Sequence, residues 1–183
     1  IVTGCDQVVL PRFRRLAPED IAEKSPGDPV TIADREAEAA IAAVLHAEDP
    51  AALVIGEEAV ADEPELRAAI DRAERVWLID PVDGTANFTT GIADFGCMLT
   101  ELHAGVPVRS WIFQAVRRRL FQATRGAGVR LNGRRLAPPR PRRTLLVGGV
   151  TPTHAGLHAP ELARPWPMTG SCTADYPLIA VGA

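Results

Sequence analysis

The segment that most constrains the fold of this chain runs from Val76 to Asn87 and has the sequence VWLIDPVDGTAN. Its first four residues form an apolar run, which predicts a short buried strand. The strand leads into the turn DPVDG, which places Asp80 and Asp83 three residues apart. Two acids so close repel each other unless a cation lies between them, and a hard divalent cation is the usual solution. A plain surface turn remains the alternative, because Pro, Asp and Gly are common turn residues.

Two upstream segments have the same character. Residues 27–38 have the sequence GDPVTIADREAE, and residues 54–58 have the sequence VIGEE, a second apolar run that ends in Gly and two carboxylates. In residue identity, order and spacing, the three motifs PVTxAD, GEE and WLIDPVDGTANF resemble those of the inositol monophosphatase family of metal-dependent phosphomonoesterases. The resemblance covers roughly residues 20–183.

The resemblance implies a layered αβαβα fold of the α/β (α+β) class, as in the sugar phosphatases. We expect a metal- and phosphate-binding subdomain with an antiparallel sheet over residues 1–136, and the start of a second α/β subdomain over residues 137–183. Members of the family continue past the equivalent of Ala183 to a Trp-Asp-x-Ala motif whose Asp completes the second metal site. We therefore expect the sequence to be a fragment with an incomplete second subdomain.

Local patterns predict the elements that carry these motifs. Ala33–Leu45 has apolar residues at helical spacing, and the Asn-Gly pair at 132–133 is a hairpin signal. Further predicted helices span 64–75 and 173–181, and predicted strands span 53–55, 76–79, 95–102, 106–113, 120–123 and 144–150.

Metal ligands follow from the resemblance. Glu57, Asp80 and the backbone carbonyl of Val82 would hold a first metal ion, and Asp80 would bridge to a second ion that Asp83 also binds. Glu58 would line the site. Carboxylate and carbonyl donors without His or Cys favour Mg²⁺ over Zn²⁺, and the complete family fold holds two or three ions. Sensitivity to lithium is expected on the same grounds.

Catalytic and substrate roles also follow from the resemblance. Gly84 and Thr85 would open a helix whose free N–H groups receive the phosphate. Asp34 and the Thr85 hydroxyl would orient the attacking water, although Asp34 also fits as a simple acid at a helix start. Gly170 and Ser171 would lie near the substrate hydroxyls.

The predicted activity is therefore hydrolysis of a small phosphorylated polyol, with inositol monophosphate first. The same chemistry on histidinol phosphate, fructose bisphosphate or a 3′-phosphoadenosine nucleotide remains open, because the pocket residues that discriminate lie mostly beyond Gly170. A second class of function, an inactive truncated fold that serves as an interaction module, also remains open. The intact Asp34, Glu57 and Asp80 argue against it.

Composition limits the partners. The 46% hydrophobic content and the mean hydropathy of +0.02 are typical of a soluble globular protein, and no apolar run reaches the roughly 20 residues that a membrane span needs. Three scattered cysteines predict reduced thiols in a cytoplasmic protein. Residues 109–143 hold eleven arginines and no acid. These arginines mostly lie in turn-like or Pro-rich stretches without interleaved aromatic residues, such as 117–119 and 138–143, so we read them as a solvated surface and predict no nucleic-acid binding. The resemblance implies a homodimer.

Overall fold

The computed structural model describes residues 1–138, 146–150, 162–167 and 169–181, the second and third of these ranges by their backbone only. The helical elements are α1 (Val2–Gly4), η1 (Cys5–Val9), η2 (Leu10–Arg12), η3 (Pro18–Asp20), α2 (Ile32–Glu48), α3 (Glu57–Asp62), η4 (Pro64–Leu66), α4 (Arg67–Ile70), α5 (Thr85–Thr89) and α6 (Cys172–Val181). The strands are β1 (Ile21–Ser25), β2 (Asp28–Thr31), β3 (Leu53–Gly56), β4 (Arg75–Asp83), β5 (Gly96–His103), β6 (Val106–Gln114), β7 (Arg119–Thr124), β8 (Gly128–Leu131), β9 (Arg134–Arg135), β10 (Leu146–Val150) and β11 (Leu162–Pro167).

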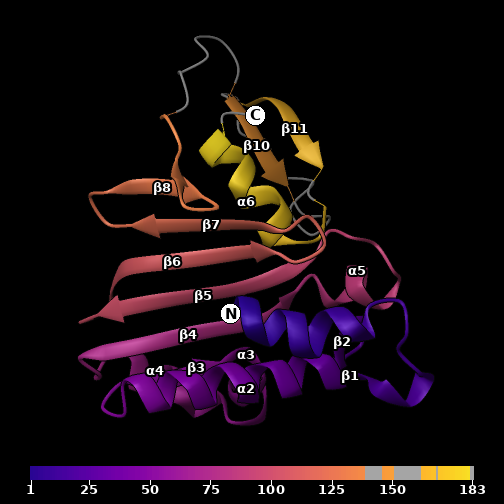
Figure 1. Ribbon diagram of the computed structural model, residues 1–183. Helices are drawn as coiled ribbons and strands as arrows, with labels where there is room; N and C mark the ends of the chain where they lie inside the picture. The colour runs from indigo at the N-terminus through magenta and orange to yellow at the C-terminus, as the bar shows by residue number, and fades with distance from the viewer. Residues whose placement is uncertain (139–145, 151–161, 168, 182–183) are drawn as a thin grey trace.

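One seven-stranded sheet organises the chain, in the order β3-β4-β5-β6-β7-β8-β9 (Figure 1). Strand β3 is parallel to β4, and every later neighbour in the sheet is antiparallel. Short connections join β5 through β9 as successive hairpins, whereas α5 lies between β4 and β5. Asn132 and Gly133 both have positive φ at the β8–β9 turn, as an Asn-Gly hairpin requires. Two smaller sheets stand apart: the β1–β2 hairpin and the parallel pair β10–β11.

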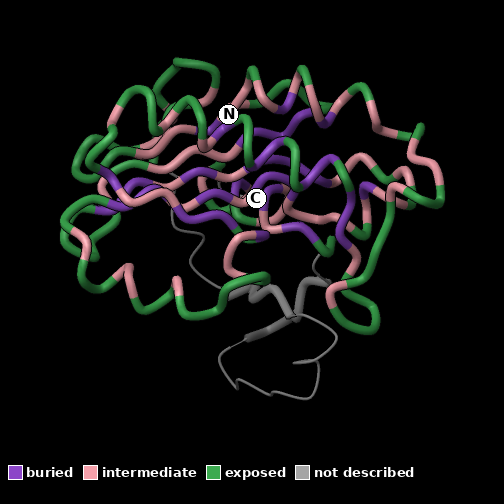
Figure 2. Tube along the Cα trace, turned by 90° about the horizontal axis from the view of Figure 1, so that it is seen from below, coloured by how far each residue is buried: buried purple, intermediate pink, exposed green. Residues whose placement is uncertain are grey.

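Helix α2 and the N-terminal helical segment cover one face of the large sheet. Because side chains alternate along a strand, Trp77 and Ile79 of β4 point to the same face, where they form a core with Ile41 of α2. A neighbouring cluster joins Cys5 and Val9 of η1 to aromatic residues and to α2, and includes Phe88, Phe95 and Phe113. Figure 2 shows these buried stretches running through the middle of the molecule.

Other helices lie on the opposite face. Val76 of β4 packs there with Ile55 of β3 and Leu102 of β5, and the partly buried side chains of Val60 and Ile70 bring α3 and α4 onto this cluster. Helix α6 contacts β5 and β6. The sheet is therefore a middle layer between two sets of helices, which positions the C-terminal end of β4 between α2 and α6 (Figure 1).

Most predicted elements are confirmed to within a few residues, but two of them differ in length and several elements of the structure were not predicted. Strand β4 continues through the carboxylate turn to Asp83, with an irregularity in its pairing after Asp80. The predicted helix over 64–75 is wrong in length: a 3₁₀ turn precedes a helix that ends at Ile70, because β4 begins at Arg75. Helix α3, the N-terminal helical segment and the β1–β2 hairpin were not predicted. The expected subdomain boundary, and residues 144–145 of a predicted strand, fall largely outside the described residues.

Within the described part of the chain, no helix has both the length and the apolar character to cross a bilayer.

Candidate metal and phosphate site

The candidate site is built around the end of β4. Gly84 follows this strand with φ of 84°, a left-handed conformation that glycine adopts without strain, and it caps the start of α5. A Cβ atom at this position would also lie 2.9 Å from the Cβ of Ser171 and 3.0 Å from the carbonyl oxygen of Asp94. Both the positive φ and the close neighbours therefore require glycine at position 84. Gly84 turns the chain so that the first N–H groups of α5 follow directly after Asp83.

Helix α2 brings Asp34 to this turn. Thr31 caps the helix, and Asp34 Oδ2 accepts hydrogen bonds from the Thr31 backbone N–H at 2.8 Å and from its hydroxyl at 2.5 Å. The other carboxylate oxygen lies 3.1 Å from Thr85 Oγ1, which is also 2.9 Å from the carbonyl oxygen of Val82. Burial raises the pKa of Asp34, and the bonds from Thr31 and Thr85 oppose that rise. The predicted pair Asp34 and Thr85 is therefore in contact.

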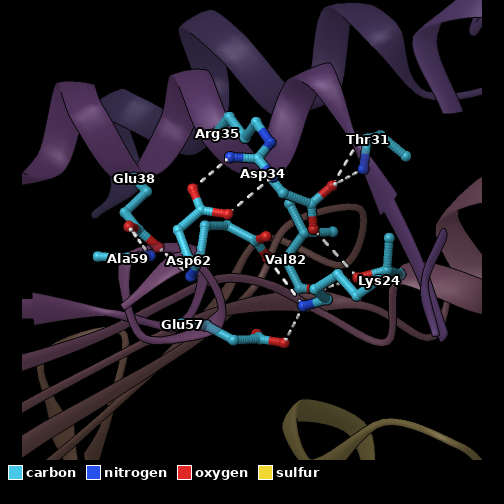
Figure 3. Close-up of polar contacts among 11 residues, drawn as sticks. Lys24, Thr31, Asp34, Arg35, Glu38, Glu57, Ala59, Asp62 and Val82 are labelled. Carbon is cyan, nitrogen blue, oxygen red and sulfur yellow. Dashed lines mark hydrogen bonds and ion pairs between the residues drawn. The ribbon is translucent and has the colours of Figure 1, made fainter. Parts of the chain in front are cut away.

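Glu57 and Glu58, at the start of α3, both form ion pairs with the ammonium group of Lys24 (Figure 3). Lys24 of β1 places its Nζ 2.6 Å from Glu57 Oε1 and 3.1 Å from Glu58 Oε1. Glu58 is buried, whereas the Glu57 carboxylate is partly exposed. Burial alone would lower the pKa of Lys24, but the two carboxylates raise it above its ordinary value. The ammonium group occupies a position where a cation is strongly favoured.

Asp80 gives the clearest sign of a cation site. Its Oδ1 atom is shielded from solvent and has no hydrogen-bond partner. Burial, followed by the neighbouring carboxylates of Glu57 and Asp83, raises the pKa of Asp80 to about 9. A shielded carboxylate with a free oxygen beside two other acids is the donor set that Mg²⁺ uses, so these residues fit the predicted metal. Yet they do not form a finished coordination shell: among the described residues, no three or more His, Cys, Asp or Glu side chains converge around one point.

Asp83 connects the site to α6. Its Oδ2 accepts bonds from Ser171 Oγ at 2.5 Å and from the Thr173 N–H at 2.7 Å, and its Oδ1 lies 3.1 Å from the Cys172 nitrogen. Ser171 itself is only 2% exposed. Its hydroxyl faces Asp83, and a substrate contact for Gly170 or Ser171 stays a prediction.

A cavity of about 550 Å³ opens beside Glu57. Lys24, Asp28 and Glu57 give it a charged end, whereas Ile55 and Leu78 give it an apolar wall on the α3–α4 side of the sheet. Of the predicted metal ligands, only Glu57 lines this cavity, and its volume is enough for a small phosphorylated molecule.

Sequence reasoning missed two residues of this site. Lys24 is the only lysine among 20 basic residues, and that isolation, immediately before the segment that carries Asp34, was the available signal. Glu38 bonds to the start of α3 (Figure 3). Glu38 lies four residues after Asp34 on the same face of the helix. From helical periodicity alone, a residue at this position is interpreted as part of a packed or solvated face.

This geometry belongs to a class of layered α/β proteins whose acidic strand ends form the site. A model of the inositol monophosphatase family matches residues 1–164, and the chain belongs to this family. The chain is 35% identical over 130 residues to the Nus factor SuhB of Pseudomonas aeruginosa, covering 71% of this chain and 46% of that protein. It is 37% identical over 116 residues to the inositol-1-monophosphatase of Rhizobium meliloti, covering 63% and 41%. The chain thus spans less than half the length of these curated relatives.

Solved structures agree on the fold. A structure described as an IMPase/NADP phosphatase complexed with NADP and Ca²⁺ superposes with a TM-score of 0.79 at 19% identity, covering 99% of this chain and 68% of that one. The SuhB protein of Bartonella henselae superposes with a TM-score of 0.72 at 24% identity, covering 98% and 74%. The expected inositol-monophosphatase-like fold is confirmed.

Proposed function

We propose that this chain carries the metal and phosphate site of a Mg²⁺-dependent phosphomonoesterase that acts on a small phosphorylated polyol, inositol monophosphate first. The observation that supports this most is Asp80, a shielded carboxylate with an unpartnered oxygen between Glu57 and Asp83. Glu57, Asp80, the Val82 carbonyl and Asp83 would hold the ions, with Glu58 beside them. The name of the Rhizobium meliloti relative supports the choice of substrate.

The chemistry requires charge neutralisation, a nucleophile and a stabilised leaving group. Bound divalent ions would neutralise the phosphate and supply an activated water. The residues of the chain provide the rest. Asp34, held by Thr31, accepts a proton from the attacking water while the Thr85 hydroxyl fixes its direction. The N–H groups of Gly84 and Thr85 at the start of α5 receive the phosphate oxygens.

Lys24 also affects the proposed metal site, through its ion pair with Glu57. Its ammonium group lies 2.6 Å from Glu57 Oε1, so a divalent ion at Glu57 would compete with Lys24 for that carboxylate.

A phosphatase assay with a Mg²⁺ titration tests the proposal. Inositol 1-phosphate should be hydrolysed only with Mg²⁺, and Asp80→Asn should abolish turnover. Histidinol phosphate, fructose 1,6-bisphosphate and a 3′-phosphoadenosine nucleotide complete the substrate panel, and the ratio of kcat/KM values ranks them. Turnover in excess EDTA would refute the metal mechanism. A protein that binds Mg²⁺ but hydrolyses none of the four would favour the alternative of a non-catalytic interaction module.

Asp34→Asn tests the role of the water-orienting carboxylate. Asn keeps the size of the side chain and can still accept a hydrogen bond, but it cannot take up a proton at neutral pH. We expect kcat to fall by roughly 10²–10⁴, the scale for loss of a general base, with Mg²⁺ affinity changed by no more than a few-fold. An almost unchanged kcat would mean that Asp34 acts only as an acid at the start of a helix.

A further inference from the structure

The start of α3 lacks a cap of its own. Helices normally begin at a residue whose side chain accepts a hydrogen bond from the backbone two or three residues later. Here the N-cap is Gly56, which has no side chain. A Cβ at Gly56 would lie 1.9 Å from Cδ of Glu38, so no larger residue fits while Glu38 keeps its position.

Glu38 of α2 supplies the missing cap from twenty residues away. Its Oε2 accepts the Glu58 N–H at 2.8 Å and its Oε1 accepts the Ala59 N–H at 3.0 Å (Figure 3). Glu38 is only 9% exposed. Each N–H bonds to a separate oxygen, so a carboxylate matches this pair of donors and an amide, with one oxygen, does not.

The capped turn holds the residue predicted to bind metal. Glu57 lies between Gly56 and the two N–H groups that Glu38 fixes, so its backbone cannot move independently of α2. Asp34 lies one helical turn earlier on α2. A single helix therefore sets the positions of both the water-orienting Asp34 and the ligand Glu57, which approach the site from different parts of the fold.

We infer that Glu38 is a positioning residue for the cation site: it holds the Gly56–Glu58 turn so that the Glu57 carboxylate faces Asp80. This inference rests on the proposed metal site, but not on turnover. Glu38 contacts neither the phosphate nor the reacting water. It acts on the site through the backbone of Glu58 and Ala59.

The main test replaces Glu38 by Gln. Glu38→Gln keeps the size of the side chain but replaces one acceptor oxygen by an NH₂ group, a donor that cannot bond to a backbone N–H, so one cap bond is lost. We expect Mg²⁺ affinity, measured by isothermal titration calorimetry with Mg²⁺ alone, to weaken about 10–100-fold, the scale for partners that orient metal ligands. At saturating Mg²⁺, kcat and the substrate KM should return to within a few-fold of wild type. Amide exchange of Glu58 and Ala59, followed by NMR without Mg²⁺, should become faster.

The matched control is Arg35→Gln. Arg35 is the neighbour of Asp34 on α2 and joins α2 to the end of α3 through an exposed ion pair with Asp62, at 2.9 Å. It too connects α2 to α3, but away from Glu57. We expect its Mg²⁺ affinity to match wild type. Wild-type affinity in Glu38→Gln, or an equal loss in Arg35→Gln, would overturn the inference.

A second pair of variants answers the case in which Glu38→Gln folds poorly. Gly56→Ala should weaken Mg²⁺ binding because the new methyl group displaces the Glu38 carboxylate. In a Glu38→Ala background that methyl group has room, so Gly56→Ala should cost little more. Additive losses would contradict a shared mechanism. A wild-type chain that binds Mg²⁺ without hydrolysing any phosphomonoester would refute the proposed function and leave this inference standing, whereas a chain that binds no Mg²⁺ would refute both.

Discussion

At the scale of single residues, the candidate site brings several carboxylates close together, and only some of them have a cationic partner. Lys24 relieves Glu57 and Glu58, but Asp80 has an oxygen without a partner. Burial and the neighbouring carboxylates of Glu57 and Asp83 disfavour the charged form of Asp80, and this repulsion lowers the stability of the folded protein where Asp80 ionises.

Asp80→Asn should consequently stabilise the metal-free protein. The folded-state pKa of Asp80 is about 9, well above its ordinary value of 3.8. The folded state therefore holds a proton that the unfolded chain releases, and wild-type stability declines as the pH rises from about 4 to 9. Asn carries no charge, so the variant should match wild type near pH 4 and exceed it increasingly toward pH 9.

Thermal unfolding in EDTA across this pH range measures the effect. Added Mg²⁺ should raise the Tm of wild type, because it binds only the folded state, and should leave Asp80→Asn nearly unchanged. A variant that is less stable than wild type at pH 8 in EDTA would contradict the repulsion argument.

At the scale of elements, the sequence predicts what local patterns control. Helix α2 and strands β5 to β7 were predicted to within a few residues because their apolar periodicity is long and their turns carry local signals. Helix α3 could not be predicted, because its cap comes from Glu38 and not from a neighbouring side chain. Lys24 was missed for the same reason: its partners are 33 and 34 residues away. Predicting the motif residues required family resemblance, whereas the contacts that support them are visible only in three dimensions.

Helix α6 shows how a local rule can be overridden. Pro177 lies inside this helix and has no N–H for the carbonyl of Thr173, four residues earlier. Gln114 of β6 fills the gap, since its Nε2 donates to that carbonyl at 2.8 Å. Both Gln114 and Thr173 are buried. A side chain of the sheet thus completes the hydrogen bonding of a helix that its own sequence interrupts.

Gln114→Leu should destabilise the protein. Leu keeps a similar volume but leaves the buried Thr173 carbonyl without a donor, and such a loss costs about 1–3 kcal/mol. Leu also removes the Gln114 Oε1 atom, which is buried without a hydrogen-bond partner, and this offsets part of that cost. Chemical denaturation at neutral pH measures the change. The matched control is Gln122→Leu on the neighbouring strand β7, which we expect to stay within about 0.5 kcal/mol of wild type, as for a surface substitution. Equal stability of the two variants would mean that the Gln114 bond contributes nothing.

At the scale of the whole molecule, Asp83 joins two parts of the chain that are almost ninety residues apart. Asp83 accepts three hydrogen bonds from the start of α6. In addition, Asn87 of α5 donates to the carbonyl of Thr169 at 3.0 Å. The candidate metal site and the docking of α6 therefore share a carboxylate. A carboxylate has about four lone-pair positions, so Asp83 can keep its bonds to α6 and still accept a cation.

Ser171→Ala should weaken the docking of α6 on Asp83. The variant removes the hydroxyl bond to Asp83 but keeps the backbone bonds from Cys172 and Thr173. We expect amide exchange in α6 to accelerate by roughly ten-fold or more, which corresponds to the loss of about 1.5–3 kcal/mol for a hydrogen bond to a charged group, with amide exchange in α2 unchanged. Thr89→Ala, which removes an exposed hydroxyl bonded within α5, is the control.

Mg²⁺ should have the opposite effect on the same helix. A cation bound at Asp83 fixes the carboxylate that α6 caps, so saturating Mg²⁺ should slow amide exchange in α6 of the wild-type chain, and less so in Ser171→Ala. Hydrogen–deuterium exchange with and without Mg²⁺ measures both responses in one experiment. Faster exchange in α6 on Mg²⁺ binding would mean that the cation competes with Ser171 for Asp83, and that metal binding and the docking of this helix oppose each other.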